Sequence, residues 1–330
     1  MLTELFSDPV AALICALVLA VAVVNGWTDA PNAIATAVCT GALSFRRAVG
    51  LAALCNLLGL VCVTAVNSSV AETLFTIAEF GAHTQAARSA LCAGLCAVVL
   101  WATAAWRFGI PTSESHALAA AVTGAALALP GGTVHAGPWG KILLGLVLSV
   151  GLGWFLGRLC TLVLNMLRLS PALCRRGQVG GAAAMAFLHG AQDGQKCLGI
   201  LLLGLSLAGN GPTGSTFSVP LEAALLCAAF MAAGTALGGR KIIDTVGREM
   251  VYLEPRQGLA ADLGGGVCLL LCTLLGLPVS TTHAKTAAIL GAGSRTNRRV
   301  AGQIVLTWLF TFPGCGLLGF FLARLFLFGP

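Results

Sequence analysis

Two acidic clusters have the residue types and the spacing of a cation site. Asp29 is followed three positions later by Asn32, and Asp193 is followed three positions later by Lys196. Carboxylate and amide oxygens, with backbone carbonyls freed where a helix breaks, are ligands that a sodium ion accepts. Lys196 lies one helical turn beyond Asp193, so it could neutralise Asp193, contact an anion or lock the break as a structural ion pair. The clusters predict cation binding or coupling at Asp29, Asn32 and Asp193, while His189 is expected to be structural.

Two hydroxyl-rich segments have the composition of an oxyanion site. Residues 111–116 read Pro-Thr-Ser-Glu-Ser-His, and residues 278–283 read Pro-Val-Ser-Thr-Thr-His. Proline followed by hydroxyl residues is typical of a helix N-terminus, where unpaired N–H groups and the helix dipole favour an anion. The predicted substrate ligands are Ser113, Ser115, Ser280, Thr281 and Thr282, together with Gln195 and Lys196. Ordinary N-capping without a ligand is the alternative.

Glu114 adds a third acid within the first of these segments. A carboxylate in an anion site is repulsive unless a cation or a proton neutralises it. Glu114 could therefore transfer the coupling proton, complete a cation site, or pair with Lys285 or Arg107. His116 and His283 follow the hydroxyl residues in both segments, and we expect them to hydrogen-bond the broken backbone. A direct contact with the anion is the alternative for both histidines.

The elements that position these residues are predicted to be membrane-spanning helices. Of the 330 residues, 57% are hydrophobic and only 9% are charged, whereas an ordinary soluble protein has about 25% charged residues. This composition excludes a soluble enzyme and predicts an all-α polytopic membrane protein in the lipid bilayer. A span needs roughly 20 apolar residues. The chain has ten such segments, near 9–44, 48–66, 89–107, 109–129, 140–166, 180–208, 219–238, 258–276, 278–293 and 300–328.

The basic residues predict the orientation of these spans. Twelve Lys and Arg residues lie in four loops, at 46–47, 168–176, 240–256 and 295–299. The intervening loops 67–88, 130–141 and 209–218 contain only Arg88 and Lys141. Cytoplasmic loops are the basic ones, so we expect a multi-pass protein of the cell inner (plasma) membrane with both termini outside. The net charge of +7 reflects this distribution, and nucleic acid is not expected as a partner.

Internal similarity predicts two inverted repeats. Residues 109–125 and 276–292, which lie 167 positions apart, are identical at nine of seventeen positions, and the two acidic clusters lie 164 positions apart. The halves are therefore 1–166 and 167–330, within one integral membrane domain. Five spans in each half would invert the second half, and each basic loop then pairs with a poorly basic one. Inverted repeats whose broken helices meet at a midplane site are the design of secondary transporters.

The motifs resemble the signatures of the inorganic phosphate transporter (PiT) family, and the chain is most similar to its bacterial members. Residues 26–33, Gly-Trp-Thr-Asp-Ala-Pro-Asn-Ala, match the family pattern Gly-x-x-Asp-x-x-Asn-Ala. Residues 189–196, His-Gly-Ala-Gln-Asp-Gly-Gln-Lys, are similar to the second copy, with Gln192 where Asn is usual. The Pro-x-Ser-Thr-Thr-His element is complete at 278–283 and partial at 111–116, where Glu114 replaces a small hydroxyl residue.

The resemblance implies a secondary active transporter that imports inorganic phosphate by alternating access, coupled to sodium or protons. It implies no enzymatic activity and no cofactor besides the coupling ion, and it leaves a homodimer open. A carrier of sulfate or another oxyanion with the same fold is the nearest alternative. An intramembrane lipid pyrophosphate phosphatase is a more distant one, because it would need an arginine cluster at the reaction centre, and only Arg107 lies close to a motif.

Overall fold

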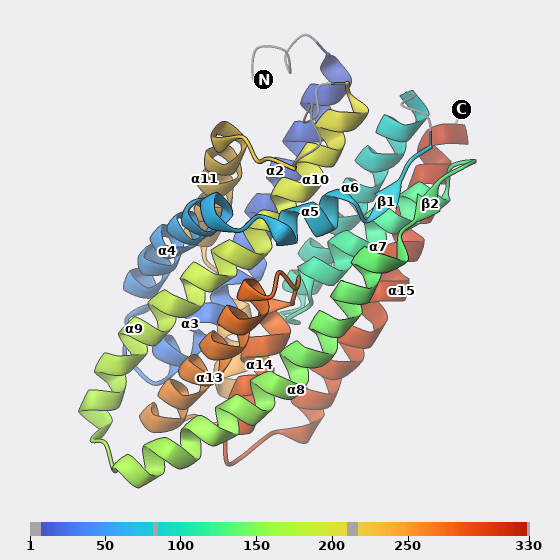
Figure 1. The fold of residues 1–330 in the computed structure, drawn as a ribbon. Coiled ribbons are helices and arrows are strands. Elements are labelled where there is room, and N and C mark those ends of the chain that lie inside the picture. The colour runs from blue at the N-terminus through green and yellow to red at the C-terminus, as the bar shows by residue number, and fades with distance from the viewer. Residues whose placement is uncertain (1–7, 82–84, 210–216, 329–330) are drawn as a thin grey trace.

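Long apolar segments rich in Ala, Leu, Val and Gly form helices, because a helix pairs its own N–H and C=O groups where no water is present. The computed structural model describes residues 8–81, 85–209 and 217–328, which form a bundle of long helices (Figure 1). The elements up to residue 167 are α2 (Pro9–Thr28), α3 (Ala30–Cys39), α4 (Phe45–Val66), α5 (Ser69–Phe75), β1 (Ala78–Glu79), α6 (Gln85–Arg107), α7 (Glu114–Leu127), β2 (Thr133–Val134) and α8 (Ala136–Leu167).

The second part of the chain is helical throughout its described elements. These are α9 (Pro171–His189), the π-helical turn η1 (Gly190–Gly194), α10 (Gln195–Leu207), α11 (Leu221–Leu237), α12 (Arg240–Asp244), the π-helical turn η2 (Thr245–Glu249), α13 (Pro255–Leu274), α14 (Thr281–Ala292) and α15 (Arg298–Phe328). The two short strands β1 and β2 pair antiparallel, with Ala78 opposite Val134. The all-α fold class is confirmed.

The outer surface of the bundle is apolar, as a membrane protein requires. Large side chains such as Val147 on α8 and Leu309 on α15 are 68% and 67% exposed. Among the described helices, six are long and apolar enough to cross a membrane, counting α2 and α3 together. A seventh is obtained if α11 and the segment Arg240–Glu249, which meet at a 66° bend, form one span. The chain is a multi-pass membrane protein.

The prediction of ten helical spans is wrong in number. The segments predicted at 109–129 and 278–293 are the helices α7 and α14, with only 14 and 12 residues, whereas a full span needs roughly 20. The segment predicted at 180–208 is divided by η1 into α9 and α10. The polar motif precedes the regular helix in the first two segments and interrupts it in the third. Part of each segment is therefore not the regular α-helix that the apolar pattern predicts.

The two short helices begin inside the protein because a glycine and a proline precede each of them. Gly109 follows α6 and Gly276 follows α13, and both have left-handed backbone, with φ of +69° and +64°. Glycine in this conformation ends a helix, and a proline shortly after it prevents continuation. Pro111 and Pro278 then lead through extended backbone to the first turns of α7 and α14. We call α7 and α14 the half-helices.

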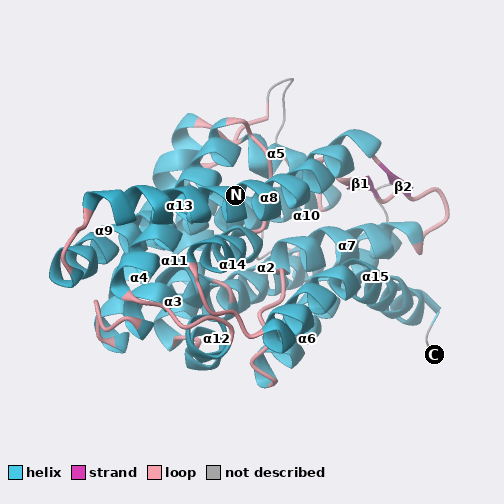
Figure 2. Ribbon diagram, turned by 90° about the horizontal axis from the view of Figure 1, so that it is seen from below, coloured by secondary structure: helices cyan, strands magenta, loops and turns pink. Residues whose placement is uncertain are grey.

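Each half-helix packs on one helix from the other half of the chain. The half-helix α7 contacts α6 and α15, and α14 contacts α13 and α8. Seen from below, α14 lies inside the bundle, and α7 lies beside α15 (Figure 2). The result is two groups of three helices, α6–α7–α15 and α8–α13–α14, which we call the first and the second triad. Each triad combines elements from both sequence halves.

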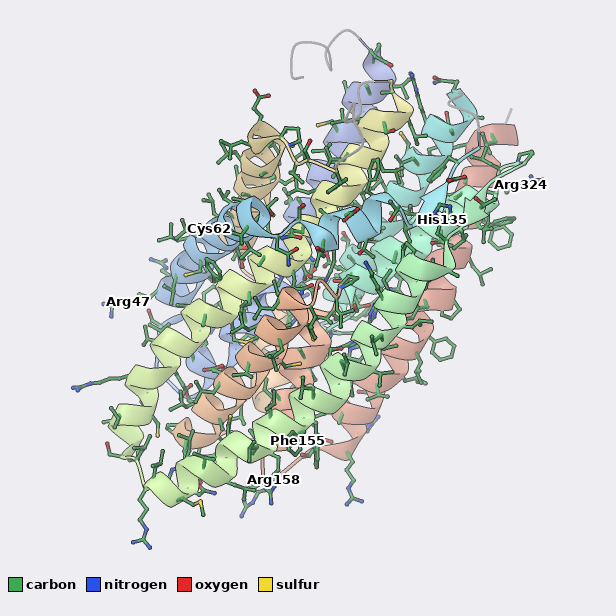
Figure 3. The ribbon with its side chains drawn as sticks, in the orientation of Figure 1. Arg47, Cys62, His135, Phe155, Arg158 and Arg324 are labelled. Atoms are coloured by element: carbon green, nitrogen blue, oxygen red, sulfur yellow. The ribbon has the colours of Figure 1, made fainter. Side chains whose placement is uncertain are left out.

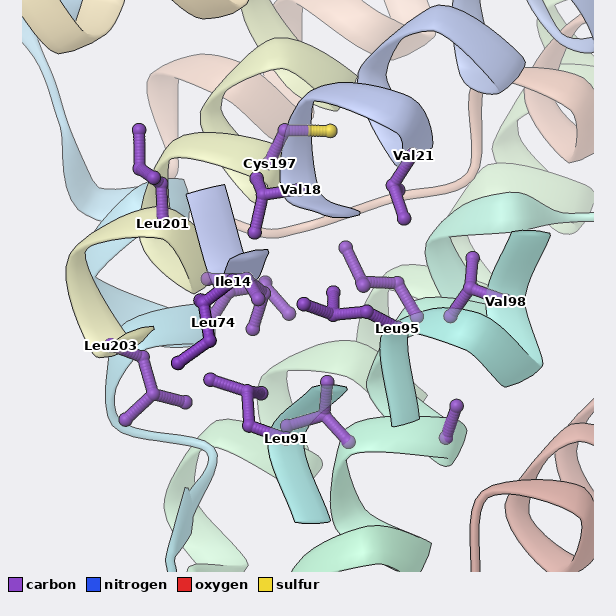
Figure 4. Close-up of a cluster of buried hydrophobic side chains, with 14 of the residues drawn as sticks. Ile14, Val18, Val21, Leu74, Leu91, Leu95, Val98, Cys197, Leu201 and Leu203 are labelled. Atoms are coloured by element: carbon purple, nitrogen blue, oxygen red, sulfur yellow. The ribbon is translucent and has the colours of Figure 1, made fainter. Parts of the chain in front are cut away.

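The hydrophobic core is divided by a polar layer. One cluster joins α2, α5, α6 and α10 and includes Ile14, Leu74, Leu91 and Leu201 (Figure 4). Further clusters join α3, α4, α9, α13 and α14, and α8 with α12 and η2. The broken elements have one part on each side, since α2 and α10 belong to the first cluster and α3 and α9 to the second. The polar motifs therefore lie between apolar cores.

Candidate functional site

The acidic residues lie where the long helical segments break. Asp29 separates α2 from α3, and Pro31 in the first turn of α3 prevents a continuous hydrogen-bond ladder. Asp193 lies in η1, a wider turn of the type that often marks a functional site. Oxygens of Asp29 and Asp193 and a ring nitrogen of His189 all lie within 4.8 Å of one another. The structure thus brings together the two predicted acids, which are 164 positions apart.

Asp29 is bound by a hydroxyl and by amides. The hydroxyl of Thr282, in the first turn of α14, donates to Asp29 Oδ1. Asn32 Nδ2 donates to the backbone carbonyl of Asp29 at 3.1 Å and to Thr282 Oγ1 at 3.0 Å, and Asn25 Nδ2 lies 3.5 Å from Asp29 Oδ2. The side-chain oxygens of Asn25 and Asn32 are buried and have no hydrogen-bond partner among the described residues. Two amide oxygens are therefore available beside the acid.

Asp193 is surrounded by three hydrogen-bond donors and by the ring of His189. Lys196 Nζ lies 2.5 Å from Asp193 Oδ1, and Ser115 Oγ donates to the same oxygen at 3.1 Å. Thr281 Oγ1 donates to Asp193 Oδ2 at 2.9 Å, and His189 Nε2 lies 3.3 Å from that oxygen. The half-helices α7 and α14 supply Ser115 and Thr281, so the first turns of both half-helices contact one carboxylate. The predicted site residues Ser115, Thr281, Asp193 and Lys196 are thus in direct contact.

The N-caps of the half-helices are the remaining predicted hydroxyl residues. Ser113 Oγ accepts the N–H of His116 at 3.3 Å, and Ser280 Oγ accepts the N–H of His283 at 3.2 Å. Both serines are completely buried. An N-cap oxygen that accepts a backbone N–H keeps its own O–H proton for another acceptor. Ser113 and Ser280 therefore have a donor left for a ligand.

The histidines of the two half-helices contact each other. The ring centroids of His116 and His283 are 4.7 Å apart, with Phe312 stacked on His116 and Trp308 against His283. Among the described residues, none hydrogen-bonds to any of the four ring nitrogens. The expectation that these histidines hydrogen-bond the broken backbone is therefore wrong. Buried polar atoms without a partner need an explanation, and a ligand between the half-helices is one.

Glu114 is buried at the start of α7 and is 2% exposed. It lines a small cavity together with Asn25, Asp193 and Lys196. Neither of its carboxylate oxygens has a hydrogen-bond partner within the described chain. Lys285, one of the partners expected from the sequence, is instead bound to Asp262. Arg107, the other expected partner, is exposed at the end of α6 and forms no ion pair with Glu114. Proton transfer and cation binding are the expected roles that remain compatible with this position.

The two glutamines of the second motif hydrogen-bond the backbone of neighbouring segments and do not contact the two acids. Gln195 Nε2 donates to the carbonyl of Asn67 at 2.7 Å, which directs the predicted substrate ligand Gln195 toward the α4–α5 connection. Gln192 donates to the carbonyl of Leu277 at 3.2 Å and accepts the N–H of Val279 at 3.2 Å. Gln192 thereby fixes the extended segment that precedes α14, which gives the longer side chain at this position a structural role.

Sequence reasoning missed two features of the site. One is a second buried ion pair, and the other is the contact of His189 with Asp193. Lys285 of α14 donates to Asp262 of α13, and Thr36 Oγ1 donates to the same carboxylate oxygen at 2.5 Å. Asp262 is the single acidic residue in the apolar segment 258–276, which was the available signal. His189, expected to be structural, contacts Asp193 and also lies 3.1 Å from Asn56 Oδ1 through Nδ1.

Broken helices with facing acids and two half-helix N-termini at one buried site define a membrane transporter. The chain matches the family model described as the phosphate transporter family twice, over residues 25–175 and 168–319. The protein belongs to this family.

Several relatives are similar over nearly the whole chain. A probable low-affinity inorganic phosphate transporter from Bacillus subtilis (strain 168) is 35% identical over 322 residues, which is 93% of each chain. A transporter with the same description from Rhizobium meliloti (strain 1021) is 37% identical over 89% of this chain and 90% of its own. A solved structure described as the sodium-dependent phosphate transporter superimposes with a TM-score of 0.84 and 22% identity, covering 96% of this chain and 98% of that chain. This last similarity establishes the shared fold.

Proposed function

We propose that the protein is a secondary active transporter that imports inorganic phosphate together with sodium by alternating access. The observation that supports this most directly is that hydroxyls from both half-helix N-termini donate to the two buried acids. One group of residues thus combines oxygens suited to a cation with donors suited to an oxyanion. Membership in the phosphate transporter family and the names of the relatives support phosphate as the anion.

The cation is proposed to bind at Asp29. The side-chain oxygens of Asn25 and Asn32 are buried without a partner next to this carboxylate. Amide oxygens are good ligands for a hard cation and poor acceptors of a transferable proton. They therefore favour sodium at Asp29. Proton coupling is the second candidate, and it is supported by the unpartnered carboxylate of Glu114.

The anion is proposed to bind between the N-termini of α7 and α14. The first-turn N–H groups and the positive ends of two helix dipoles favour an anion there. Ser113 and Ser280 add hydroxyl protons, and His116 and His283 add ring nitrogens that have no partner in the described structure. A tetrahedral anion can use donors that approach it from opposite sides.

Cation and anion binding are coupled through the hydroxyl of Thr282. This hydroxyl donates to Asp29, so it is not free to bind an anion while Asp29 lacks a cation. A cation on Asp29 would take over the neutralisation of the carboxylate and release the Thr282 proton for the anion. The cation would also offset the repulsion between the acid and the anion. We therefore expect the cation to bind first.

Carboxylates beside the anion favour phosphate over sulfate. At neutral pH phosphate keeps at least one O–H that can donate to a carboxylate, whereas sulfate has none. A site with buried acceptors discriminates strongly against a ligand that leaves them unpaired. The enzyme alternative is not favoured, because the described side chains that line the cavity beside the acids include no arginine.

The proposed orientation places both termini of the chain outside the cell. The helix α2 begins and α15 ends at the same, upper end of the molecule (Figure 1). Arg158 extends from the lower part of the bundle, whereas His135 and Arg324 lie near the upper end (Figure 3). The basic loops at 168–176 and 295–299 connect elements at the lower end. The positive-inside rule supports a cytoplasmic location for that end.

Uptake of radiolabelled phosphate into proteoliposomes tests the proposal. Sodium and proton gradients are imposed separately, and sulfate is added as a competitor. We expect uptake to follow the sodium gradient and sulfate to compete weakly. Uptake that ignores both gradients would refute coupled transport, and uptake driven by protons alone would favour the Glu114 alternative.

Asp29→Asn tests the cation site. Removing the charge of a direct ligand should lower the apparent affinity for sodium by more than the roughly 10–100-fold that is typical of residues behind the ligands, while the variant still purifies as a folded protein. Glu79→Gln is the matched control, because it is the same type of change at a glutamate of the exposed strand β1. Unchanged sodium dependence in Asp29→Asn would contradict this assignment.

A further inference from the structure

The central site contains the same hydrogen-bond network twice, and one copy contains a lysine. Each network has a carboxylate, the residue three positions later, and a hydroxyl from a half-helix. The members are Asp29, Asn32 and Thr282 in one network and Asp193, Lys196 and Ser115 in the other. The first two pairs of equivalent residues are 164 positions apart, and the hydroxyl residues are 167 apart, as the internal repeat requires. Asn32 and Lys196 therefore occupy equivalent places.

The Lys196 ammonium is bound in the way that a small cation would be bound. It lies 2.5 Å from Asp193 Oδ1 and 2.6 Å from Ser115 Oγ, and it donates to the backbone carbonyl of Val279. Carboxylate, hydroxyl and carbonyl oxygens are the ligand types of hard cations in proteins. An ammonium group has three N–H donors, and these three oxygens use all of them. Lys196 thus has no N–H left for an anion in this structure.

The equivalent place at Asp29 holds an amide instead of a cation. Asn32 Nδ2 makes the equivalent contact to Thr282, but it has no charge to neutralise Asp29. Lys285 of α14, the other buried lysine of the described chain, is bound to Asp262. Among the described residues, no lysine or arginine forms an ion pair with Asp29, and the amide oxygens of Asn25 and Asn32 beside it are without partners. A buried carboxylate needs a counter-charge.

We propose that the Lys196 ammonium permanently takes the place of a second coupling cation, so that the protein exchanges a single sodium ion, at Asp29. The inference rests on the proposed sodium-coupled transport and specifies its stoichiometry. A cation attached to the chain neutralises Asp193 in every state and cannot be released on either side of the membrane. The Asp193 network therefore holds the half-helices but moves no ion. Asp29, which lacks such a group, is the site where an ion must bind and leave.

Direct measurement of sodium binding to the purified protein tests this inference. With radioactive sodium in detergent, the wild type should bind one ion per chain, and Asp29→Asn should bind none. Lys196→Asn copies the residue of the other network and exposes Asp193, so it should bind two ions. Lys196→Arg is the matched control, since it keeps the positive charge and should bind one. The double variant Asp29→Asn/Lys196→Asn should bind one ion, at Asp193.

Uptake kinetics give a second measurement of the same quantity. The sodium dependence of phosphate uptake should have a Hill coefficient of about 1 in the wild type and should approach about 2 in a Lys196→Asn variant that still transports. Two ions per chain in the wild type, or one ion in folded Lys196→Asn, would overturn the inference. A wild type that binds no sodium would overturn it together with the sodium site at Asp29.

The outcomes separate this inference from the proposed function. A wild type without phosphate uptake refutes the function, whereas sodium-driven uptake with two bound ions refutes only the role of Lys196. If Lys196→Asn does not fold, the wild type and Asp29→Asn still test the inference. One bound ion is expected in the wild type and none in Asp29→Asn, and two ions in the wild type would contradict the proposal.

Discussion

Glu114 is a residue at which the two half-helices differ in chemistry close to the buried acids. Its equivalent 167 positions later is Thr281, whose hydroxyl donates to Asp193 at 2.9 Å. Both oxygens of Glu114 are instead buried and without hydrogen-bond partners in the described part of the chain. The carboxylate lies in the same cavity as Asp193 and Lys196, so its charge acts directly on an anion bound between the half-helices.

Removing this charge should strengthen phosphate binding. Glu114→Gln keeps the size of the side chain and replaces a carboxylate that repels the anion. We expect the KM for phosphate to fall by roughly tenfold, which corresponds to about 1.4 kcal/mol. Initial rates of uptake at saturating sodium measure this, with Glu79→Gln on the exposed strand β1 as the control. A raised KM would indicate instead that Glu114 is a ligand of the coupling cation.

Among the elements, α13 and α14 are joined by an ion pair that the first half lacks. Asp262 and Lys285 are almost completely buried and bound to each other. The residues 167 positions earlier, Leu95 of α6 and Leu118 of α7, belong to the first hydrophobic cluster. The equivalent positions are thus apolar in the first half and form an ion pair in the second.

Breaking this pair should destabilise the protein more than replacing it. Asp262→Leu alone leaves the Lys285 charge buried, which costs about 3–5 kcal/mol, whereas a hydrophobic replacement of both partners is often neutral. We therefore expect a large loss of thermal stability in Asp262→Leu and recovery of most of it in Asp262→Leu/Lys285→Leu. Thermal unfolding in detergent measures both. A double variant as unstable as the single one would show that the pair is required as such.

The start of α2 is fixed by an acid whose contribution should depend on pH. Asp8 caps α2 by accepting the N–H groups of Val10 and Ala11, and Arg88 lies 2.6 Å from its carboxylate. The hydrogen bond from Ala11, helped by Val10 and Arg88, holds the pKa of Asp8 below its ordinary value of 3.8. The stabilisation is therefore complete above that value and is lost as the pH falls through the lower pKa of the folded state.

Asp8→Asn isolates this effect, because asparagine also caps helices well but has no charge. We expect the variant to unfold at a lower temperature than the wild type at neutral pH, and the difference to shrink as the pH is lowered to about 3. Unfolding curves recorded in parallel at both pH values measure this. A difference that is independent of pH would show that the charge of Asp8 contributes nothing.

The sequence was sufficient to predict the helical class, the breaks and most members of the site, because these depend on local residue types. Gly109 and Pro111 indicate the end of one helix, and Ser113 indicates the start of the next. Half-helices beginning at these motifs were therefore predicted, but the segment 109–129 was still counted as a full span, because hydropathy alone does not register the extended residues before α7. Two contacts could not be predicted from the sequence, that of Asp262 with Lys285 and that of Lys196 with Val279. They depend on how α13, α14 and η1 pack in three dimensions.

At the scale of the whole molecule, the two triads are the units that the packing favours. The first triad, α6–α7–α15, and the second, α8–α13–α14, each combine two helices of one half with the last long helix of the other. His116 and His283, which are equivalent in the internal repeat, contact each other with ring centroids 4.7 Å apart. Equivalent residues in contact lie close to the axis that relates the two halves. If transport proceeds by alternating access as proposed, we expect one triad to move against the other at this contact.

Distances between spin labels can distinguish motion of the triads from motion of the sequence halves. In a variant in which the thirteen cysteines are replaced, labels at the exposed residues Leu100 of α6 and Leu317 of α15 lie in one triad but in different halves. Labels at Leu100 and at Leu159 of α8 lie in one half but in different triads. Because each triad is packed internally, we expect the first distance to stay constant and the second to change by several ångströms, on the order of the shifts seen in domain motions, when sodium and phosphate are added. The reverse result, a constant distance from Leu100 to Leu159 and a changing one from Leu100 to Leu317, would show that residues 1–166 move as a unit.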